Sequence, residues 1–313
     1  MSNKNGAYFL STPHFWVRCD PMKNASGGKK MTSKYTYLLA LLPFLIVVLL
    51  FELLPRFMLI IDSFGSDADK TVLFTLENYK KIFTTLSYKT AIKNSLIITF
   101  VSTVVGIVIA FLGAQAAHNS RGKFSNAFMT VLNMTSNFAG VPLAFAYMII
   151  IGNAGVLKQV ANVYGIGFIQ NFDLYSSSGL ILMYIYFQIP LSTLLLIPAF
   201  NGIRKEWQEA TMLLGGRSST FWFKVGIPVL IPSIFGTISV LFANALCAYA
   251  TAYALLMNNF SLLPVNISAA FTGDIRSQPS LGAALSVVMM ILMVVVIFVD
   301  NYIVKKTTQW KTR

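Results

Sequence analysis

The stretch Glu206–Pro232, EWQEATMLLGGRSSTFWFKVGIPVLIP, is the most polar part of the chain between two long apolar segments. A helix-forming run, Trp207–Leu214, ends at the glycine pair Gly215-Gly216, where left-handed backbone angles cost little. A second helix-forming run, Ser218–Gly226, is predicted to end at Pro228. A helix, a glycine turn and a second helix on one side of a bilayer form a docking loop. The alternative is an ordinary amphipathic connector.

The composition of the chain excludes a soluble protein. Of its 313 residues, 56% are hydrophobic and only 11% are charged, whereas a soluble domain carries about 25% charged residues. The net charge of +13 does not indicate a nucleic-acid partner, because the basic residues lie in a tail and in short loops. Cys19 and Cys247 form neither a disulfide framework nor a metal-ligand pattern, so we expect no metal site.

Six apolar segments have close to the roughly 20 residues that a membrane helix needs. They predict an all-α membrane protein with six transmembrane helices, at residues 37–61, 96–117, 128–151, 180–198, 230–257 and 283–304. Prolines at positions 142, 190 and 232 are predicted to kink their helices.

The loops between these segments predict how the chain crosses the membrane. Sixteen Lys and Arg residues lie in the tail, the 118–126 loop, the 201–229 loop and the C-terminus, against seven in the other loops. The positive-inside rule then places both termini and the 201–229 loop in the cytoplasm. We expect a poorly ordered basic tail (1–34), one membrane domain (35–305) and a short cytoplasmic C-terminus (306–313).

The loops on the opposite side are predicted to contain no separate domain. The 62–94 loop has amphipathic stretches, FTLENYKKIF and SYKTAIKNS, which are suited to the membrane interface or to short helices. The 152–179 loop is rich in Gly and Ser and is a candidate gate cover or partner surface. The 258–281 loop is predicted to be turn-rich from its Gly, Pro and Ser content.

The stretch around the glycine pair resembles the EAA loop of permeases in binding-protein-dependent ABC importers. That pattern is Glu-Ala-Ala, three residues, Gly, nine residues and Ile-x-Leu-Pro. Here Glu209-Ala210-Thr211 opens the pattern, Gly215 falls at its glycine, and Val225-Gly226-Ile227-Pro228 closes it. The segments LLPFLIVVLLFELLP and NSLIITFVSTVVGIVIAFLGA look like those of maltose- and polyamine-type permeases, so the resemblance covers nearly all of the chain after the tail.

The resemblance implies a type I ABC importer permease fold and a multi-pass subunit of the bacterial inner membrane. It also implies four kinds of neighbour: membrane lipid, two ATPase subunits, a second and different permease, and an external solute-binding protein. The chain would not be an enzyme and would bind no cofactor, because it lacks a G-x-x-x-x-G-K-[ST] run; ATP and Mg would be used by the partner ATPase. The residues implied to contact the ATPase are Glu209, Ala210, Thr211, Gly215, Arg217 and Pro228.

Polar side chains within the predicted spans are candidates for the transport pathway, because such groups are costly in lipid and usually face a cavity or another helix. Contacts between helices are the alternative role. The candidates are Asn133, Ser136, Asn137, Gln188, Asn244, Thr251 and Tyr253.

The transported solute is predicted from a further resemblance. The segments FANALCAYATAYALLMNN and GDIRSQPSLGAAL look closer to polyamine, phosphonate and ferric-iron permeases than to sugar permeases. A polyamine-type solute is therefore the first prediction, although we expect no unpaired acidic residue within a span to bind a cation. Phosphonate, other organic anions, ferric iron and sugar are alternatives within the importer class. Outside it, an ion-coupled secondary transporter or channel would show intramembrane ionisable residues or inverted repeats. A membrane enzyme would instead need clustered catalytic side chains.

Overall fold

The computed structural model describes residues 34–67, 74–119, 123–257, 260–272 and 277–308, and within these ranges the chain is helical with no strand. The chain divides into two units, Met1–Leu53 and Leu54–Arg313. Apart from Lys34, the predicted basic tail lies outside the described residues. Within the described residues, six segments are long and apolar enough to cross a membrane, which confirms the predicted number: Leu41–Asp62, Leu86–Asn119, Val141–Tyr164, Ser177–Asn201, Ser218–Leu246 and Pro279–Thr307.

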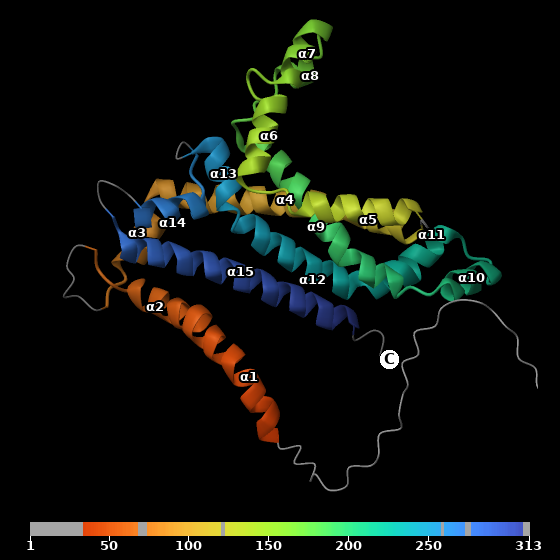
Figure 1. The fold of residues 1–313 in the computed structure, drawn as a ribbon, viewed down its shortest axis with the longest axis horizontal. Coiled ribbons are helices and arrows are strands. Elements are labelled where there is room, and N and C mark those ends of the chain that lie inside the picture. Colours follow the sequence, from red (N-terminus) through yellow and green to blue (C-terminus); the bar gives the residue numbers. More distant parts are fainter. Residues whose placement is uncertain (1–33, 68–73, 120–122, 258–259, 273–276, 309–313) are drawn as a thin grey trace, which may run out of the picture. The chain divides into compact units, whose positions relative to one another are not determined.

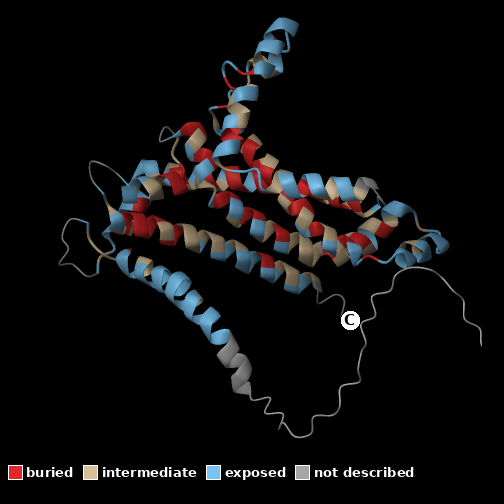
Figure 2. Cartoon of the chain, in the orientation of Figure 1, coloured by how far each residue is buried: buried red, intermediate tan, exposed pale blue. Residues whose placement is uncertain are grey.

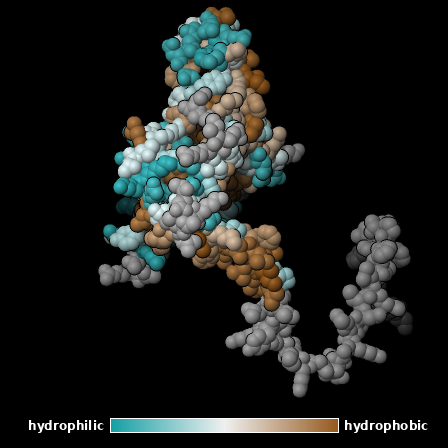
Figure 3. Space-filling view, turned by 90° about the vertical axis from the view of Figure 1, so that its left-hand side faces the viewer, coloured by the Kyte–Doolittle hydropathy of each residue, from teal (hydrophilic) through white to brown (hydrophobic). Residues whose placement is uncertain are grey.

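The described part of the first unit is helix α1 (Lys34–Val48) followed by the π-helical turn η1 (Leu49–Leu53). Pro43 lies inside α1. Nearly all side chains from residue 41 to residue 53 are exposed (Figure 2), and all of them except Glu52 are apolar. Brown surface in Figure 3 shows exposed apolar side chains of this kind. A helix with so much apolar exposed surface is suited to contact with lipid or with another membrane helix.

The second unit is built around helices α4 (Leu86–Asn119) and α9 (Ser177–Asn201), which contact each other more extensively than any other described pair. Gly106 of α4 shows how closely they approach, because a β-carbon there would lie 3.2 Å from the Gln188 Cβ of α9. Small residues at a helix interface allow such an approach in membrane proteins. Those that α4 buries include Ala91, Ser95, Ser102, Ala110 and Ala114.

Two further long helices, α12 (Ile227–Leu246) and α15 (Pro279–Thr308), pack against each other, and α12 also contacts α4 and α9 (Figure 1). Helix α2 (Leu54–Asp62) contacts α15. Helix α15 runs a few residues past the predicted end of the membrane domain at residue 305. These contacts give the second unit a core of membrane-length helices.

The predicted third span, residues 128–151, is wrong in its boundaries. Residues 137–140 divide it into α5 (Lys123–Ser136) and α6 (Val141–Ile151), and Gly140 in the break has a φ of 73°. Pro142 therefore does not kink a continuous helix; it lies in the first turn of α6, where its missing N–H leaves no helical hydrogen bond unmade. Helix α5 packs against α9, whereas α6 packs against α13 (Tyr249–Leu256).

The predicted fifth span, residues 230–257, is also divided. Helix α12 ends at Leu246, and α13 begins at Tyr249 after a break at Cys247 and Ala248. Helix α12 therefore ends before residue 257, the predicted end of the span. It starts at Ile227, which is before the predicted start at residue 230. Pro190 and Pro232 lie inside α9 and α12.

The prediction that a helix ends at Pro228 is wrong. Helix α11 (Ser218–Phe221) continues through a π-helical turn, η2 (Trp222–Gly226), directly into α12. In η2 the Ile227 N–H bonds to the Trp222 carbonyl five residues earlier. A proline ring inside a regular α-helix would clash with the carbonyl four residues before it, and a π-helical turn widens the helix at that point. The helix therefore passes through Pro228 instead of stopping.

Several shorter helices of the described chain lie outside the six membrane-length segments or at their ends. Of the amphipathic stretches, TLENYKKIF forms α3 (Glu77–Thr84), whereas SYKTAIKNS is the beginning of α4. Helix α8 (Gly167–Gln170) follows α7 (Val156–Tyr164). The turn-rich prediction for residues 258–281 missed α14 (Leu263–Thr272), which packs against α15 and α4. Helix α10 (Lys205–Leu213) begins the predicted docking loop.

Candidate functional site

The first half of the docking loop is a short helix with a well-formed C-terminal stop. Helix α10 ends at Leu213, and Gly215 follows with a φ of 79°. The Gly215 N–H bonds to the Met212 carbonyl at 3.0 Å, and the Gly216 N–H bonds to the Thr211 carbonyl at 2.9 Å. This pair of hydrogen bonds is a Schellman motif, which needs a left-handed residue at the position of Gly215. The glycine turn in the sequence is therefore present in the structure.

Thr211, which stands where the EAA pattern has its second alanine, fits this turn without an unpaired hydroxyl. Its Oγ1 donates a hydrogen bond of 2.8 Å to the Trp207 carbonyl within α10. Its methyl group faces Gly216, where a β-carbon would lie 2.8 Å from Thr211 Cγ2. Gly215 adopts the left-handed backbone conformation that the turn needs, and the missing side chain of Gly216 leaves room for the Thr211 methyl group.

Helix α10 and the turn after it expose apolar side chains and a carboxylate, and no described part of the chain packs over them. Glu209, Ala210 and Arg217 are exposed, and no described side chain pairs with the Glu209 carboxylate. Leu213 and Leu214 are each 89% exposed, and Met212 is 50% exposed. Consecutive leucines with this exposure beside an unpaired carboxylate are typical of a surface that a partner protein covers.

Both ends of the docking loop are fixed to the buried core of the second unit. Phe221 is 1% exposed and belongs to a cluster with Phe200, Ile203 and Leu230, which bring together the end of α9 and the start of α12 (Figure 1). The Trp222 ring lies 5.5 Å from that of Phe221 and 6.0 Å from that of Phe200. The segment that follows α10 is therefore packed against the end of α9 and the start of α12.

The sequence did not predict that Phe221, Trp222 and Gly226 fix the docking loop to the buried core. We call this packed group the anchor of the loop. A β-carbon at Gly226 would lie 2.5 Å from the Trp222 ring atom Cε3, so only glycine lets that ring pack across η2. The sequence did contain a signal for this packing, namely aromatic residues close to a glycine. The π-helical turn that brings Trp222 and Gly226 together could not be inferred from that pattern.

The candidate pathway residues of α5 make only local hydrogen bonds. The Asn133 Nδ2 donates to the Met129 carbonyl, and both Ser136 Oγ and Asn137 Nδ2 donate to the Asn133 carbonyl. Asn137, in the break after α5, also lines an open recess of about 340 Å³ together with Met134, Thr135, Phe138 and Tyr186. Asn133 and Asn137 are exposed, so neither side chain holds two of the described helices together.

The other candidate pathway residues fall into two groups. Gln188 and Thr251 are buried, and the Gln188 Nε2 donates a hydrogen bond of 3.0 Å to the Ser102 Oγ of α4. The Gln188 Oε1 has no hydrogen-bond partner among the described residues. Asn244 is exposed, and Tyr253 is 42% exposed with its ring stacked on Tyr249 at 5.2 Å. The candidates therefore do not lie on one shared surface. Gln188 is buried, and its hydrogen bond connects α9 to α4.

The expectation that no acidic residue stands unpaired within a span is wrong. Asp300 lies in α15 with an exposed fraction of 8%. Its carboxylate accepts a hydrogen bond from the Ser239 hydroxyl of α12, and no described basic side chain pairs with it. Asp300 was overlooked because it lies near the C-terminal end of the last apolar run, close to Lys305 and Lys306.

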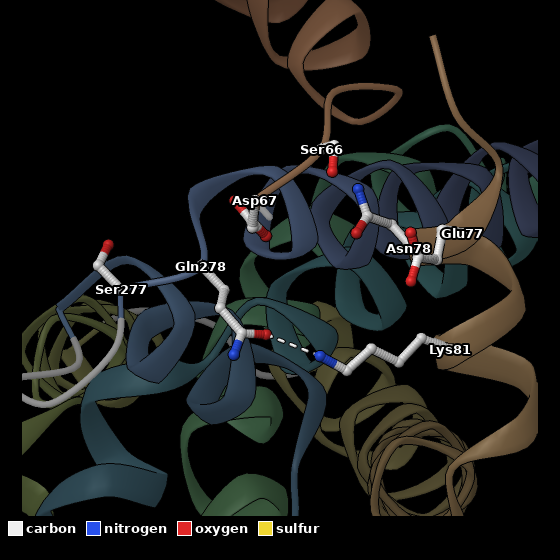
Figure 4. A pocket seen from close by; sticks show the side chains of 7 residues that line it. All are labelled: Ser66, Asp67, Glu77, Asn78, Lys81, Ser277 and Gln278. Atoms are coloured by element: carbon white, nitrogen blue, oxygen red, sulfur yellow. Dashed lines mark hydrogen bonds between the residues drawn. The ribbon is translucent and has the colours of Figure 1, made fainter. Parts of the chain in front are cut away.

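A polar pocket of about 180 Å³ lies beside α3 and the start of α15 (Figure 4). Within the second unit these elements lie at the end opposite α10 (Figure 1). The Asp67 carboxylate accepts hydrogen bonds from the backbone N–H groups of Ser280 and Leu281, in the first turn of α15. The Lys81 Nζ donates to the Gln278 Oε1 at 2.9 Å, and the Asn78 Nδ2 donates to the Gly65 carbonyl at 2.8 Å. These bonds engage the side chains of Asp67, Asn78, Lys81 and Gln278, and they tie α3 and the residues just after α2 to the start of α15.

Comparison with known proteins yields relatives over most of the chain, although no protein-family profile matches it. A sulfoquinovosyl glycerol transport system permease of Agrobacterium fabrum is 25% identical over 82% of this chain and 88% of its own length. An inner membrane ABC transporter permease of Escherichia coli is 26% identical over 78% of this chain and 84% of its own length. The names of other relatives mention sulfate, thiamine and ferric iron.

Solved structures agree with these relatives on the fold. A chain of a bacterial ABC transporter involved in the import of alginate superposes with a TM-score of 0.70 and 16% identity, over 89% of this chain and 98% of that chain. With six apolar helices, this confirms the predicted multi-pass protein of the inner membrane. No subgroup of permeases is favoured. The chain has the fold of ABC importer permeases, and its relatives among curated proteins are permease subunits of ABC transporters.

Proposed function

We propose that the chain is a permease subunit of an ATP-driven importer and that α10 couples it to a separate ATPase. The exposed Leu213–Leu214 pair beside the unpaired Glu209 carboxylate is the observation that carries this proposal. The Schellman turn at Gly215-Gly216 sets the direction in which the chain leaves α10, and the Phe221 cluster packs the following segment against α9 and α12. A rigid short helix on a packed base can transmit a push from a partner into membrane helices.

The coupling proposal includes an orientation. The positive-inside rule supports placing α10, the N-terminal tail and the end of α15 in the cytoplasm, where an ATPase would meet them. Two ATPase subunits, a second and different permease and an external solute-binding protein would complete the importer. ATP and Mg would bind to the ATPase subunits and not to this chain.

The contact with the ATPase can be tested by co-purification from cells that express the chain with its ATPase. The variant Leu213→Ser with Leu214→Ser should lose the ATPase while the membrane domain stays inserted, because both side chains are 89% exposed and support no internal packing. Phe168→Ser in α8 is the matched control, since Phe168 is 84% exposed outside the loop. Retention of the ATPase by the double variant would contradict the proposal.

For the solute, we propose a polyamine-type cation as the first candidate. Its support is the sequence likeness of the α12–α13 segment and the start of α15 to polyamine, phosphonate and ferric-iron permeases. Sugar derivatives, sulfate, thiamine and ferric iron, which appear in the names of relatives, are the alternatives. A thermal-shift screen of the proposed external solute-binding protein would decide between them, since that subunit would select the solute.

An ion-coupled secondary transporter is the second candidate function, and Asp300 is the observation that favours it, because intramembrane carboxylates serve ion coupling in such proteins. Uptake measurements separate the two. ATP-driven import should stop when the ATPase is removed and should tolerate collapse of the ion gradient. Uptake that persists without the ATPase and stops with the gradient would establish the secondary transporter instead.

A further inference from the structure

An apolar groove of about 680 Å³ lies where the docking loop enters α12 and α15 ends. Its apolar lining is Val225, Pro228, Val229 and Ile231, and Thr307 of α15 also lines it. Two lysines, Lys224 and Lys306, contribute the charged part of the lining. The groove is within the range of about 300–1,000 Å³ that is usual for small-molecule sites.

The position of the groove along the helices points to the edge of the membrane. Lys224 and Val225 lie near the start of the candidate span Ser218–Leu246, and Lys306 and Thr307 lie at the very end of the candidate span Pro279–Thr307. Both lysines are exposed, and no described carboxylate pairs with either of them. The Thr307 hydroxyl is already bonded to the Ile303 carbonyl, so the ammonium groups are the polar groups left for a ligand.

We propose that this groove binds one anionic phospholipid, with its phosphate between Lys224 and Lys306 and an acyl chain along the apolar wall. Charge complementarity selects this occupant, because two unpaired ammonium groups above a hydrocarbon-lined groove match a negatively charged headgroup and its chain. Basic pockets between membrane helices are typical sites for such headgroups. The groove includes Pro228 and adjoins η2, so the lipid would brace the end of the docking loop against α15.

Lipid binding in this groove can be distinguished from a general attraction of lysines to an anionic membrane surface. Two other lysines of the chain provide the matched control. Lys305 is adjacent to Lys306 and exposed, and Lys205 lies in the same loop as Lys224, but neither lines the groove. The double variants Lys224→Gln/Lys306→Gln and Lys205→Gln/Lys305→Gln therefore lose equal charge from the same part of the chain. The proposal does not depend on the ATPase contact or on the solute.

The test is native mass spectrometry of the full-length chain titrated with phosphatidylglycerol or with zwitterionic phosphatidylcholine. A lysine near an anionic lipid surface contributes a factor of about five in affinity, so the loss of both should weaken the first phosphatidylglycerol site roughly 30-fold. The Lys205/Lys305 variant should weaken it little, and phosphatidylcholine binding should not change in either variant. Val229→Trp, which fills the groove without changing charge, should also weaken that first site.

Three results would overturn the proposal. Equal weakening by the two double variants would show attraction to the surface only. Displacement of phosphatidylglycerol by inorganic phosphate would show a site for a free anion without an acyl chain. Loss of the bound lipid when the chain is assembled with its second permease and ATPase would show that a protein partner covers the groove.

Discussion

Gly216 lies so close to Thr211 that a β-carbon at residue 216 would be 2.8 Å from the Thr211 Cγ2 and 2.9 Å from the Thr211 carbonyl oxygen. The carbonyl also accepts the Gly216 N–H, so it cannot move away without breaking the turn. Gly216→Ala should therefore destabilise the end of α10 by about 1–3 kcal/mol, the usual cost of overpacking. Limited proteolysis after Arg217 would measure the opening of the loop.

The matched control for this prediction is Gly236→Ala in α12, where a β-carbon would meet nothing within 4 Å. That substitution should leave proteolysis after Arg217 unchanged. Adding Thr211→Ala to Gly216→Ala should restore part of the protection, because it removes the methyl contact and leaves the contact with the carbonyl. Equal proteolysis of Gly216→Ala and the parent protein would show that the turn tolerates a side chain.

Phe221 and Phe223 provide a second prediction, since they are two residues apart in the loop and differ in burial. Phe221 is 1% exposed, whereas Phe223 is 74% exposed. Phe221→Ala should lower the free energy of unfolding by about 3–5 kcal/mol, and Phe223→Ala should change it by less than about 0.5 kcal/mol. Thermal unfolding in detergent would measure both, and similar melting temperatures would contradict the proposed anchor.

The hydrogen bond from Ser239 to Asp300 joins α12 to α15 and leads to a third prediction. Ser239→Ala should destabilise the protein by about 1–3 kcal/mol, because a buried carboxylate would lose its hydrogen-bond donor. Asp300→Asn should cost less, since the amide oxygen can still accept the Ser239 hydroxyl. Thermal unfolding of the two variants is the measurement, and a larger loss for Asp300→Asn would point to a need for the charge itself.

Cysteine labelling gives a fourth prediction, about access from water. In a background with Cys19→Ala and Cys247→Ala, Asn137→Cys should react with a polar thiol reagent, because Asn137 lines an open recess. Gln188→Cys should be protected, because Gln188 has an exposed fraction of zero between α4 and α9. Labelling of Gln188→Cys during ATP-driven turnover but not at rest would place Gln188 in the pathway of another conformation.

The sequence was sufficient to predict that there are six spans, because the length of an apolar run indicates a membrane helix. It was also sufficient to predict that α10 ends at the glycine pair, because glycine favours the end of a helix. The breaks at residues 137–140 and 247–248 were missed, since residues on both sides are apolar and hydropathy does not register a change of helix direction. Gly140 and Pro142 together were the available signal. The burial of Gln188 could not be predicted, because the face it presents depends on how α9 packs against α4. Helix α14 was missed because Gly, Pro and Ser flank a short apolar run.

The role of Glu209 is the fifth prediction and concerns the central claim, that α10 receives force from an ATPase. Breaking a charge-assisted contact at such an interface costs about 2–5 kcal/mol, which is enough to uncouple transport while the membrane domain stays folded. Glu206→Ala is the matched control, since Glu206 is also exposed and also lies in α10 but falls outside the EAA pattern.

The most direct measurement is ATP-driven solute uptake into proteoliposomes that contain the assembled importer, with each variant at equal membrane abundance. The account predicts that Glu209→Ala abolishes uptake and that Glu206→Ala imports at the parent rate. Parent-rate uptake by Glu209→Ala would contradict the assignment of α10 as the coupling helix.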